Sequence, residues 1–88
     1  MMNEDHVDGN AVGGVLMDIF GREMTDARAC CARCASVGPM GALIAYTRAP
    51  GDVLRCATCG SVMLVAVPRP TGLRVTFEAM KWVASARR

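Results

Sequence analysis

The strongest chemical signal in this sequence is the spacing of its cysteines. Four of the five cysteines form two C-x-x-C pairs, Cys31 with Cys34 and Cys56 with Cys59, and 21 residues separate the pairs. Thiolates suit zinc, which takes four ligands at the corners of a tetrahedron in a structural site. The separation is close to the roughly 15–20 residues typical of such sites. The sequence therefore predicts one structural Zn²⁺ bound by Cys31, Cys34, Cys56 and Cys59, with iron on the same four sulfurs as the alternative.

Cys30, the fifth cysteine, directly precedes the first pair. With Cys34 it would form a C-x-x-x-C clamp, which is looser than the clamp that Cys31 offers. We therefore expect Cys30 to be a small strand residue or a spare thiol. An alternate metal ligand or a reactive thiol is the second interpretation of this residue.

The residue after each pair bears on how the chain turns around the metal. Gly60 follows Cys59 and accepts a positive φ at little cost. Ala35 holds the equivalent place after Cys34 and is expected to fit this turn less well. In such turns, backbone amides point at the sulfurs and stabilise their negative charge.

Disulfides or a redox pair are the competing interpretation of the four cysteines, and they need an oxidising compartment. Residues 1–6 are polar and acidic, without the basic segment and apolar run of a signal peptide. The longest apolar run, residues 62–67, is six residues long, which predicts a buried strand and is too short to cross a bilayer. We therefore expect a cytoplasmic protein in which metal binding is favoured over disulfides.

The length of 88 residues allows one domain. A chain of this size buries only about 60–65% of its surface on folding, so a bound metal is a common means of stabilising the fold. We expect residues 1–9 to be a disordered tail and residues 10–88 to form the single domain.

Apolar residues at helical spacing predict a helix over residues 10–20, which Gly21 ends. The apolar stripe consists of Val12, Val15, Leu16, Ile19 and Phe20. We expect this stripe to pack into the core. A docking helix for a partner is the alternative.

The remaining elements predict a small, metal-stapled, mainly β fold. A ribbon over residues 25–78 would contain strands at 25–30, 40–48, 53–55, 61–67 and 73–78, with turns at 49–52 and 68–72. A short C-terminal helix is expected over 79–86, with Met80, Trp82 and Val83 as packing residues. This order predicts a zinc ribbon of three to four antiparallel strands with a helix at each end.

The net charge of +2 hides an asymmetry along the chain. Residues 1–26 carry six acidic side chains against one arginine, whereas residues 27–88 carry nine basic side chains against two acidic ones. In the simplest interpretation the two halves complement each other within one fold. A basic face for nucleic acid is the functional alternative, although no aromatic residues are interleaved with the arginines for stacking on bases.

Short motifs in a fixed order also carry a resemblance. They are D-G-N-A at 8–11, F-G at 20–21, C-x-x-C at 31–34, Y-x-x-A-P-G at 46–51, R-C-x-x-C-G at 55–60 and an apolar strand at 62–67. With these motifs the chain resembles a family of short bacterial zinc-ribbon proteins of unknown function, common in actinobacteria. The resemblance covers nearly the whole chain. Ala35 departs from it, because glycine often follows the second cysteine of such C-x-x-C turns. It implies the zinc-ribbon fold and brings no agreed activity.

No catalytic constellation accompanies the cysteines, and four thiolates leave a metal no open position, so we expect no enzyme. The favoured function is a protein-interaction or accessory module, with a protein partner or a second copy bound. Zinc ribbons recur in ribosomal proteins and RNA-polymerase subunits, so a ribosome-, polymerase- or nucleic-acid-associated role is the second hypothesis. A rubredoxin-like iron electron carrier is the third.

Overall fold

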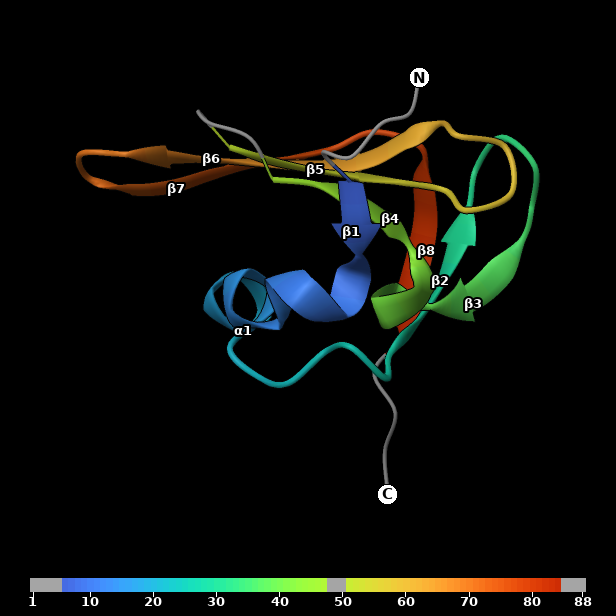
Figure 1. Cartoon of the computed structure of the whole chain (residues 1–88), viewed down its shortest axis with the longest axis horizontal. Helices are drawn as coiled ribbons and strands as arrows, with labels where there is room; N and C mark the ends of the chain where they lie inside the picture. Colours follow the sequence, from blue (N-terminus) through green and yellow to red (C-terminus); the bar gives the residue numbers. More distant parts are fainter. Residues whose placement is uncertain (1–5, 48–50, 85–88) are drawn as a thin grey trace.

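The computed structural model describes residues 6–47 and 51–84. In chain order its elements are β1 His6–Asp8, the 3-10 helix η1 Gly9–Val12, α1 Gly13–Phe20, β2 Arg28–Cys31, β3 Val37–Pro39, the 3-10 helix η2 Met40–Ala42, β4 Ile44–Tyr46, β5 Asp52–Arg55, β6 Val62–Arg69, β7 Gly72–Phe77 and β8 Met80–Ala84 (Figure 1). The described residues are thus mainly β with one N-terminal helix, as the sequence predicts.

The strands form two antiparallel sheets instead of one ribbon. The first sheet has five strands in the order β1-β4-β5-β6-β7, and the second has three in the order β3-β2-β8. The expected count of three to four strands was therefore too low. The additional strands arise because both ends of the chain return to the sheets and pair with their edges.

The helical segment covers the inner face of the five-stranded sheet (Figure 1). Val12 and Leu16 of the predicted stripe are buried, while Val15, Ile19 and Phe20 are half-buried and pack against the same core. Gly21 ends the helix in the left-handed conformation with φ of 76°. The prediction that this stripe belongs to the core is confirmed.

The N-terminal boundary needs a correction. Residues 6–8, expected in a disordered tail over 1–9, form β1 and pair with Ile44–Tyr46 of β4, and residues 1–5 lie outside the described residues. Gly9 follows at a point where a side chain would collide with the carbonyl oxygen of Met40. Because of this close approach η1 packs against η2, and only glycine fits at this position of the D-G-N-A motif.

The C-terminal helix expected over 79–86 is wrong. Residues 80–84 form strand β8, which pairs with β2, and residues 85–88 lie outside the described residues. The pairing satisfies the backbone groups along one edge of β2, which outweighs the weak local preference for helix. Met80 and Val83 pack against the core as expected, but Trp82 is 42% exposed.

Two further boundaries differ. In the expected strand 40–48, residues 40–42 form η2 and only Ile44–Tyr46 form a strand, while Arg48 lies outside the described residues, as do residues 49 and 50 of the expected turn. The expected turn at 68–72 shrinks to residues 70–71, because Arg69 already pairs with Gly72. The β6–β7 hairpin therefore extends beyond the body of the molecule (Figure 1).

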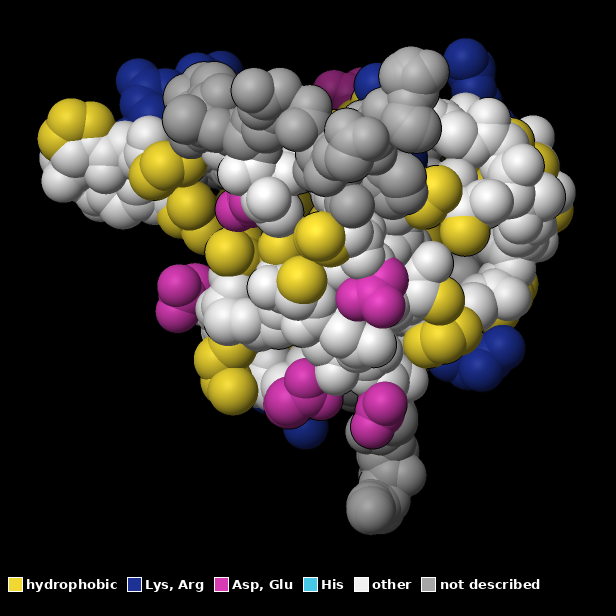
Figure 2. Space-filling model, in the orientation of Figure 1, with side chains coloured by type: hydrophobic (Ala, Val, Ile, Leu, Met, Phe, Trp, Pro, Cys, Tyr) yellow, Lys and Arg dark blue, Asp and Glu magenta, His cyan; other side chains and the backbone are white. Residues whose placement is uncertain are grey.

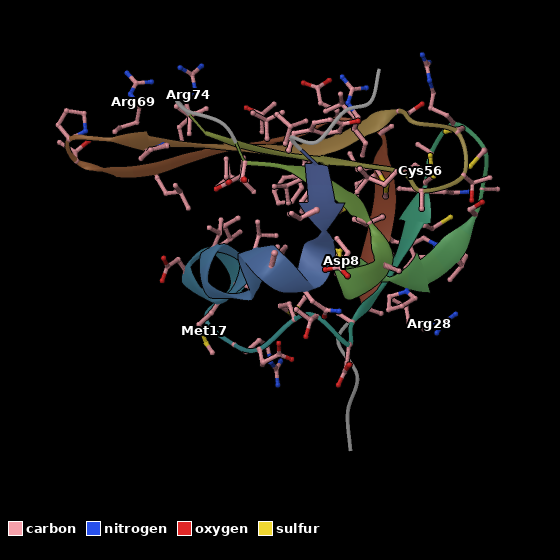
Figure 3. All side chains as sticks on the ribbon, viewed as in Figure 1. Asp8, Met17, Arg28, Cys56, Arg69 and Arg74 are labelled. Atoms are coloured by element: carbon pink, nitrogen blue, oxygen red, sulfur yellow. The ribbon has the colours of Figure 1, made fainter. Side chains whose placement is uncertain are left out.

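The core lies between the five-stranded sheet, the helical segment and β2. Its buried leucines are Leu16, Leu43, Leu54 and Leu64, and its buried methionines Met24, Met40 and Met63 are at most 3% exposed. These three methionines are thus part of the core, whereas Met17 is 44% exposed and points away from the sheet (Figure 3).

Candidate metal centre

The two C-x-x-C pairs lie in turns that belong to different sheets. The first knuckle, residues 31–37, joins β2 to β3 in the three-stranded sheet. The second knuckle, residues 56–62, joins β5 to β6 in the five-stranded sheet. Any ion bound by both knuckles would therefore connect the two sheets.

The four predicted sulfurs come together in space. The Sγ atoms of Cys31, Cys34, Cys56 and Cys59 all lie within 4.8 Å of one another. Cys31 Sγ is 3.7 Å from Cys59 Sγ, and Cys34 Sγ is 3.6 Å from Cys56 Sγ. Four sulfurs placed about 2.3 Å from a central zinc at tetrahedral angles would be about 3.8 Å apart. The cluster therefore has the size of a four-thiolate metal site, and all four cysteines are free of disulfides.

The backbone of each knuckle makes the same hydrogen bonds. Ala35 N donates to Cys31 O at 2.9 Å, and Gly60 N donates to Cys56 O at 2.9 Å. Cys31 N donates to Ser36 O at 3.0 Å, and Cys56 N donates to Ser61 O at 2.9 Å. These paired bonds close each turn, so that both cysteines of a pair face one point.

Further donors surround the sulfurs in matching positions. Arg33 N donates to Cys31 Sγ at 3.3 Å, and Thr58 N donates to Cys56 Sγ at 3.4 Å. The hydroxyl of Ser36 lies 3.3 Å from Cys34 Sγ. The hydroxyl of Ser61 lies 3.2 Å from Cys59 Sγ. In these contacts the Cys34 and Cys59 thiols donate to the serine oxygens, and each hydroxyl can donate in return once the thiol is ionised. Donors to sulfur stabilise thiolates, which are the metal-binding form.

The serines are functional neighbours that the sequence reasoning missed. The signal is present, because the knuckles read C-A-R-C-A-S-V at 31–37 and C-A-T-C-G-S-V at 56–62. Five of these seven positions are identical, and Ser36 and Ser61 are among them. A comparison of the two pairs that extended three residues further would have found them.

The pKa values of three cysteines respond to these surroundings. The Ser61 hydroxyl and then its backbone N–H lower the pKa of the exposed Cys59 thiol to about 6. Burial opposes ionisation of Cys56, but the N–H groups of Cys59 and Thr58 outweigh it and leave its pKa lowered. The N–H of Cys34 favours the thiolate of Cys31, yet burial and the neighbouring thiols leave its pKa raised. A bound cation would compensate the charge that such a cluster of thiolates concentrates.

Cys30 and Ala35 flank the first C-x-x-C pair. Cys30 is buried, its thiol donates to Cys31 O at 3.7 Å, and it is not among the four clustered sulfurs. Ala35 adopts φ of 65° and Gly60 φ of 80°, so both turns use the left-handed conformation. Among the described residues Ala35 is the only residue other than glycine with positive φ. The expected poor fit of Ala35 is a local backbone strain that the first knuckle tolerates.

The knuckles differ in how they are fastened. In the second, Arg55 Nη1 donates to Gly60 O at 2.8 Å, and the Arg55 guanidinium lies 5.6 Å from the centroid of the Tyr46 ring. In the first, Ala32 N donates to Ala79 O at 3.0 Å, which ties the knuckle to the chain before β8. The second knuckle is therefore held by a side-chain hydrogen bond and the first by a backbone hydrogen bond.

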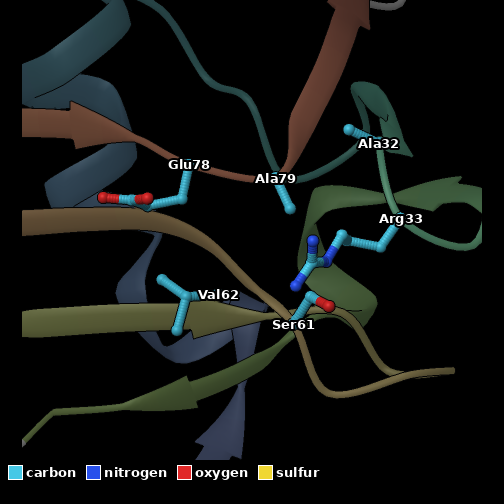
Figure 4. A pocket seen from close by; sticks show the side chains of 6 residues that line it. All are labelled: Ala32, Arg33, Ser61, Val62, Glu78 and Ala79. Carbon is cyan, nitrogen blue, oxygen red and sulfur yellow. The ribbon is translucent and has the colours of Figure 1, made fainter.

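A hollow of about 550 Å³ opens beside the first knuckle (Figure 4). Its lining residues are Ala32, Arg33, Ser61, Val62, Glu78 and Ala79. Arg33 points toward Ser61 across this hollow (Figure 4). None of the four cysteines lines it.

Within residues 6–47 and 51–84, no second group of histidine, cysteine or acidic side chains is arranged to hold a metal. In the same part of the chain, no helix is long and apolar enough to span a membrane. The cysteine cluster is therefore the feature on which a function must be built.

Comparisons with known proteins give one match. No curated protein and no solved structure is similar enough to this chain to count as a match. A family model matches residues 3–88, in agreement with the resemblance to a family of unknown function. Since the match spans nearly the whole chain, the protein belongs to DUF6510, a family of unknown function.

Proposed function

We propose that this protein is a small interaction module whose two sheets are held together by one structural Zn²⁺. The observation that carries the metal assignment is the spacing of the four sulfurs, 3.6 and 3.7 Å across the two knuckles, close to the edge of a zinc–thiolate tetrahedron. Each knuckle belongs to a different sheet. The ion therefore contributes directly to the stability of the fold.

The role of the ion is structural because four thiolates complete its coordination. A catalytic zinc keeps one position for water or substrate. Here the amides of Arg33 and Thr58 and the hydroxyls of Ser36 and Ser61 supply the outer contacts of the sulfurs. Such contacts orient ligands and favour thiolates, and they activate no water. We propose a reducing, cytoplasmic location, which keeps the thiols available.

Metal analysis of the purified protein tests this proposal. We expect about one zinc per chain by elemental mass spectrometry, and a Co²⁺-substituted protein with the visible spectrum of four thiolates in a tetrahedron. A chelator should unfold both sheets together, measured by circular dichroism. A red protein with iron would favour the electron-carrier hypothesis. An unchanged melting curve after metal removal would contradict the structural role.

The outer face of the three-stranded sheet supports the interaction role. Val37 and Trp82 lie directly opposite Cys30, one on each neighbouring strand, and are 46% and 42% exposed. Pro39 lies opposite Arg28 on the same face and is also exposed. Exposed tryptophan in an apolar surrounding is a frequent centre of protein interfaces. We call Val37, Pro39 and Trp82 the Trp82 patch.

A quantitative pull-down from the native host tests the Trp82 patch. We expect Trp82→Ala to lose the partner proteins that the unchanged protein retains. Met17→Ala is the matched control, because Met17 is similarly exposed at 44% on α1, outside the patch. Both variants should retain metal. Retention of the same partners by Trp82→Ala would contradict binding through this surface.

One observation favours nucleic-acid binding as a second candidate. Arg69 and Arg74 extend from the side of the β6–β7 hairpin that faces away from α1 (Figure 3). Four exposed acidic side chains, Asp8, Asp18, Glu23 and Asp26, lie on or next to the helical segment, and acidic groups gather over that half of the molecule (Figure 2). Phosphate binding would make retention on RNA or DNA fall steeply with salt, and Arg69→Glu should weaken it. No binding at low salt would exclude this candidate.

A further inference from the structure

The outer edge of β7 is the longest sheet edge in the described structure. The five-stranded sheet ends at β1, with three residues, and at β7, with six. The three-stranded sheet ends at β3, with three residues, and at β8, with five. An edge strand presents unpaired backbone donors and acceptors, and its capacity to bind another strand grows with its length.

The other three sheet edges have features that discourage pairing with a strand from another chain, whereas β7 has few such features. β1 is short, β3 is short and ends at Pro39, and β8 carries Lys81. Short strands, proline and lysine are the usual means by which proteins blunt edges. On β7, Leu73 and Phe77 are 38% and 50% exposed, and the strand belongs to a hairpin that extends away from the body (Figure 1). A second strand could therefore approach without meeting the rest of the molecule.

The register of the hairpin shows which backbone groups face the open edge. Glu78 N donates to Met63 O at 2.9 Å, so Glu78 directs its backbone toward β6. Because residues alternate along an antiparallel ladder, Arg74 and Thr76 do the same, and Leu73, Val75 and Phe77 direct their N–H and C=O groups outward. Those three apolar residues also share the inner face of the sheet, where Phe77 and Phe20 lie with ring centroids 6.3 Å apart.

We propose that a second copy of this chain pairs with that edge, β7 against β7 in antiparallel orientation, centred on Val75. Val75 then exchanges hydrogen bonds with Val75 of the second copy, and Leu73 pairs with Phe77 of the second copy. The two five-stranded sheets join into one, and the exposed parts of Leu73 and Phe77 cover each other. The surface lies outside the cysteine cluster, so the proposal deepens the interaction role without depending on which metal is bound.

Backbone pairing favours this register over its neighbour centred on Thr76, which would place Leu73 opposite Ala79, whose N–H already donates to Val62 O at 2.9 Å. Arg74 lies opposite Thr76 of the second copy and diagonally next to its Glu78, a pair of opposite charge that the two-fold symmetry produces twice. Arg74 is also diagonal to Arg74 of the second copy, a like-charge contact that occurs once, so the attractive contacts outnumber the repulsive one. A register centred on Arg74 would instead place two arginines directly opposite each other, which is repulsive. The sequence of β7 is thus complementary to itself, which argues for a second copy over an unrelated strand.

The interface consists of one strand from each copy and is small, so we expect a dimer that depends on concentration. Analytical ultracentrifugation of the metal-loaded full chain, from about 10 µM to 1 mM, should show the mass rising from monomer toward dimer. A monomer throughout this range would overturn the proposal. Growth into larger species would also overturn it, because pairing through a single edge closes at two copies.

Two sets of variants test the surface. Val75→Pro removes an N–H that no described strand uses and should abolish the dimer while circular dichroism and metal content stay unchanged. Arg74→Glu should weaken the dimer about tenfold, because two attractive contacts become repulsive. The double variant Arg74→Glu with Glu78→Arg should restore it. Arg69→Glu, with the same change in charge on β6, is the matched control and should leave the dimer intact.

The outcomes separate this proposal from that of the metal site. A dimer that persists in both Val75→Pro and Arg74→Glu would show that another surface holds it. If Val75→Pro disturbs the fold, the charge reversal and its restoration decide the question alone. Metal content, measured in every variant, reports on the cysteine cluster independently.

Discussion

The two knuckles share a backbone turn but are attached to the molecule by different means. Each closes with the same pair of backbone hydrogen bonds and places a serine hydroxyl beside its second cysteine. The first uses alanine in the left-handed position and is tied by its backbone to Ala79, whereas the second uses glycine and is tied by the Arg55 side chain. The shared turn and serine are the features that a metal site requires. The attachments to Ala79 and Arg55 differ because each knuckle belongs to a different sheet.

In both knuckles the first cysteine is more deeply buried than the second. Cys31 and Cys56, the first cysteine of each pair, are both buried. Cys34 is half-buried and Cys59 is exposed. The first cysteine of a pair continues from a strand into the core, while the second lies at the tip of the turn.

Removal of one thiolate should have the largest effect on stability, and the effect should be equal in the two knuckles. Cys31→Ser and Cys56→Ser should each lose the metal and lower the free energy of unfolding on the order of 5 kcal/mol, because one ion serves both sheets. Metal content and chemical denaturation measure this. Cys30→Ser is the control and should keep its metal. A large loss in only one of the two variants would contradict a shared site.

Exchange of the left-handed residues should have opposite effects in the two knuckles. Ala35→Gly relieves the backbone strain at φ of 65° and should stabilise the protein by about 1 kcal/mol. Gly60→Ala introduces the same strain at φ of 80° and should destabilise it by about 1 kcal/mol or slightly more. Thermal unfolding of both variants in the metal-loaded state checks the signs. If both variants were stabilised, or both destabilised, the two turns would not be equivalent.

Loss of the Arg55 side chain should loosen only the second knuckle. Arg55→Ala removes the bond to Gly60 O and the contact with Tyr46, and should cost about 1 kcal/mol. Hydrogen exchange should increase at residues 57–60 and stay unchanged at residues 32–35. Arg33→Ala is a control for the loss of an arginine. An increase in both knuckles would show that the attachment is shared.

The serines should affect thiol ionisation with little change in stability. In the metal-free protein, Ser61→Ala should raise the pKa of Cys59 from about 6 toward its usual value near 8.5. Iodoacetamide labelling from pH 5 to 9, read by mass spectrometry, measures this pKa. Ser36→Ala should leave Cys59 unchanged, and an equal shift in both variants would contradict the assignment to Ser61.

The lowered pKa of Cys59 also sets the direction of a pH effect. A thiol whose pKa is lower in the folded state favours folding above its unfolded pKa, and this contribution is lost as the pH falls through about 6. Metal binding requires the same thiolate, so metal affinity should fall as the pH is lowered, and release should occur at a lower pH than protonation of Cys59 in the metal-free protein. Co²⁺ absorption during an acid titration follows the release.

The predictability of the fold depends on how local each feature is. The helix stripe of Val12 and Leu16 and the left-handed Gly21 follow from short stretches of sequence, and both are present in the structure. Residues 73–77 form a strand as predicted, but Leu73 and Phe77 are exposed. The strand at 80–84 was wrongly predicted as a helix because the strand it pairs with, β2, lies about 50 residues earlier in the chain. The same holds for β1, which forms only because β4 leaves an edge for it.

The candidate site shows the same division. The spacing of the cysteines selects Cys31, Cys34, Cys56 and Cys59, and these four sulfurs are the ones that cluster. Their use as zinc ligands stays our proposal. The sequence could not show that the knuckles belong to two sheets, or that Trp82 faces outward instead of packing inside.

By itself the sequence determined the two turns, their four sulfurs and the helix that covers the core, because turns and helices are stabilised by residues close together in the chain. Only the tertiary structure decided which strands pair, which edges stay open and which apolar residues remain on the surface. Strand pairing depends on partners far away in the sequence, and each strand can accept either neighbour until the whole sheet is in place.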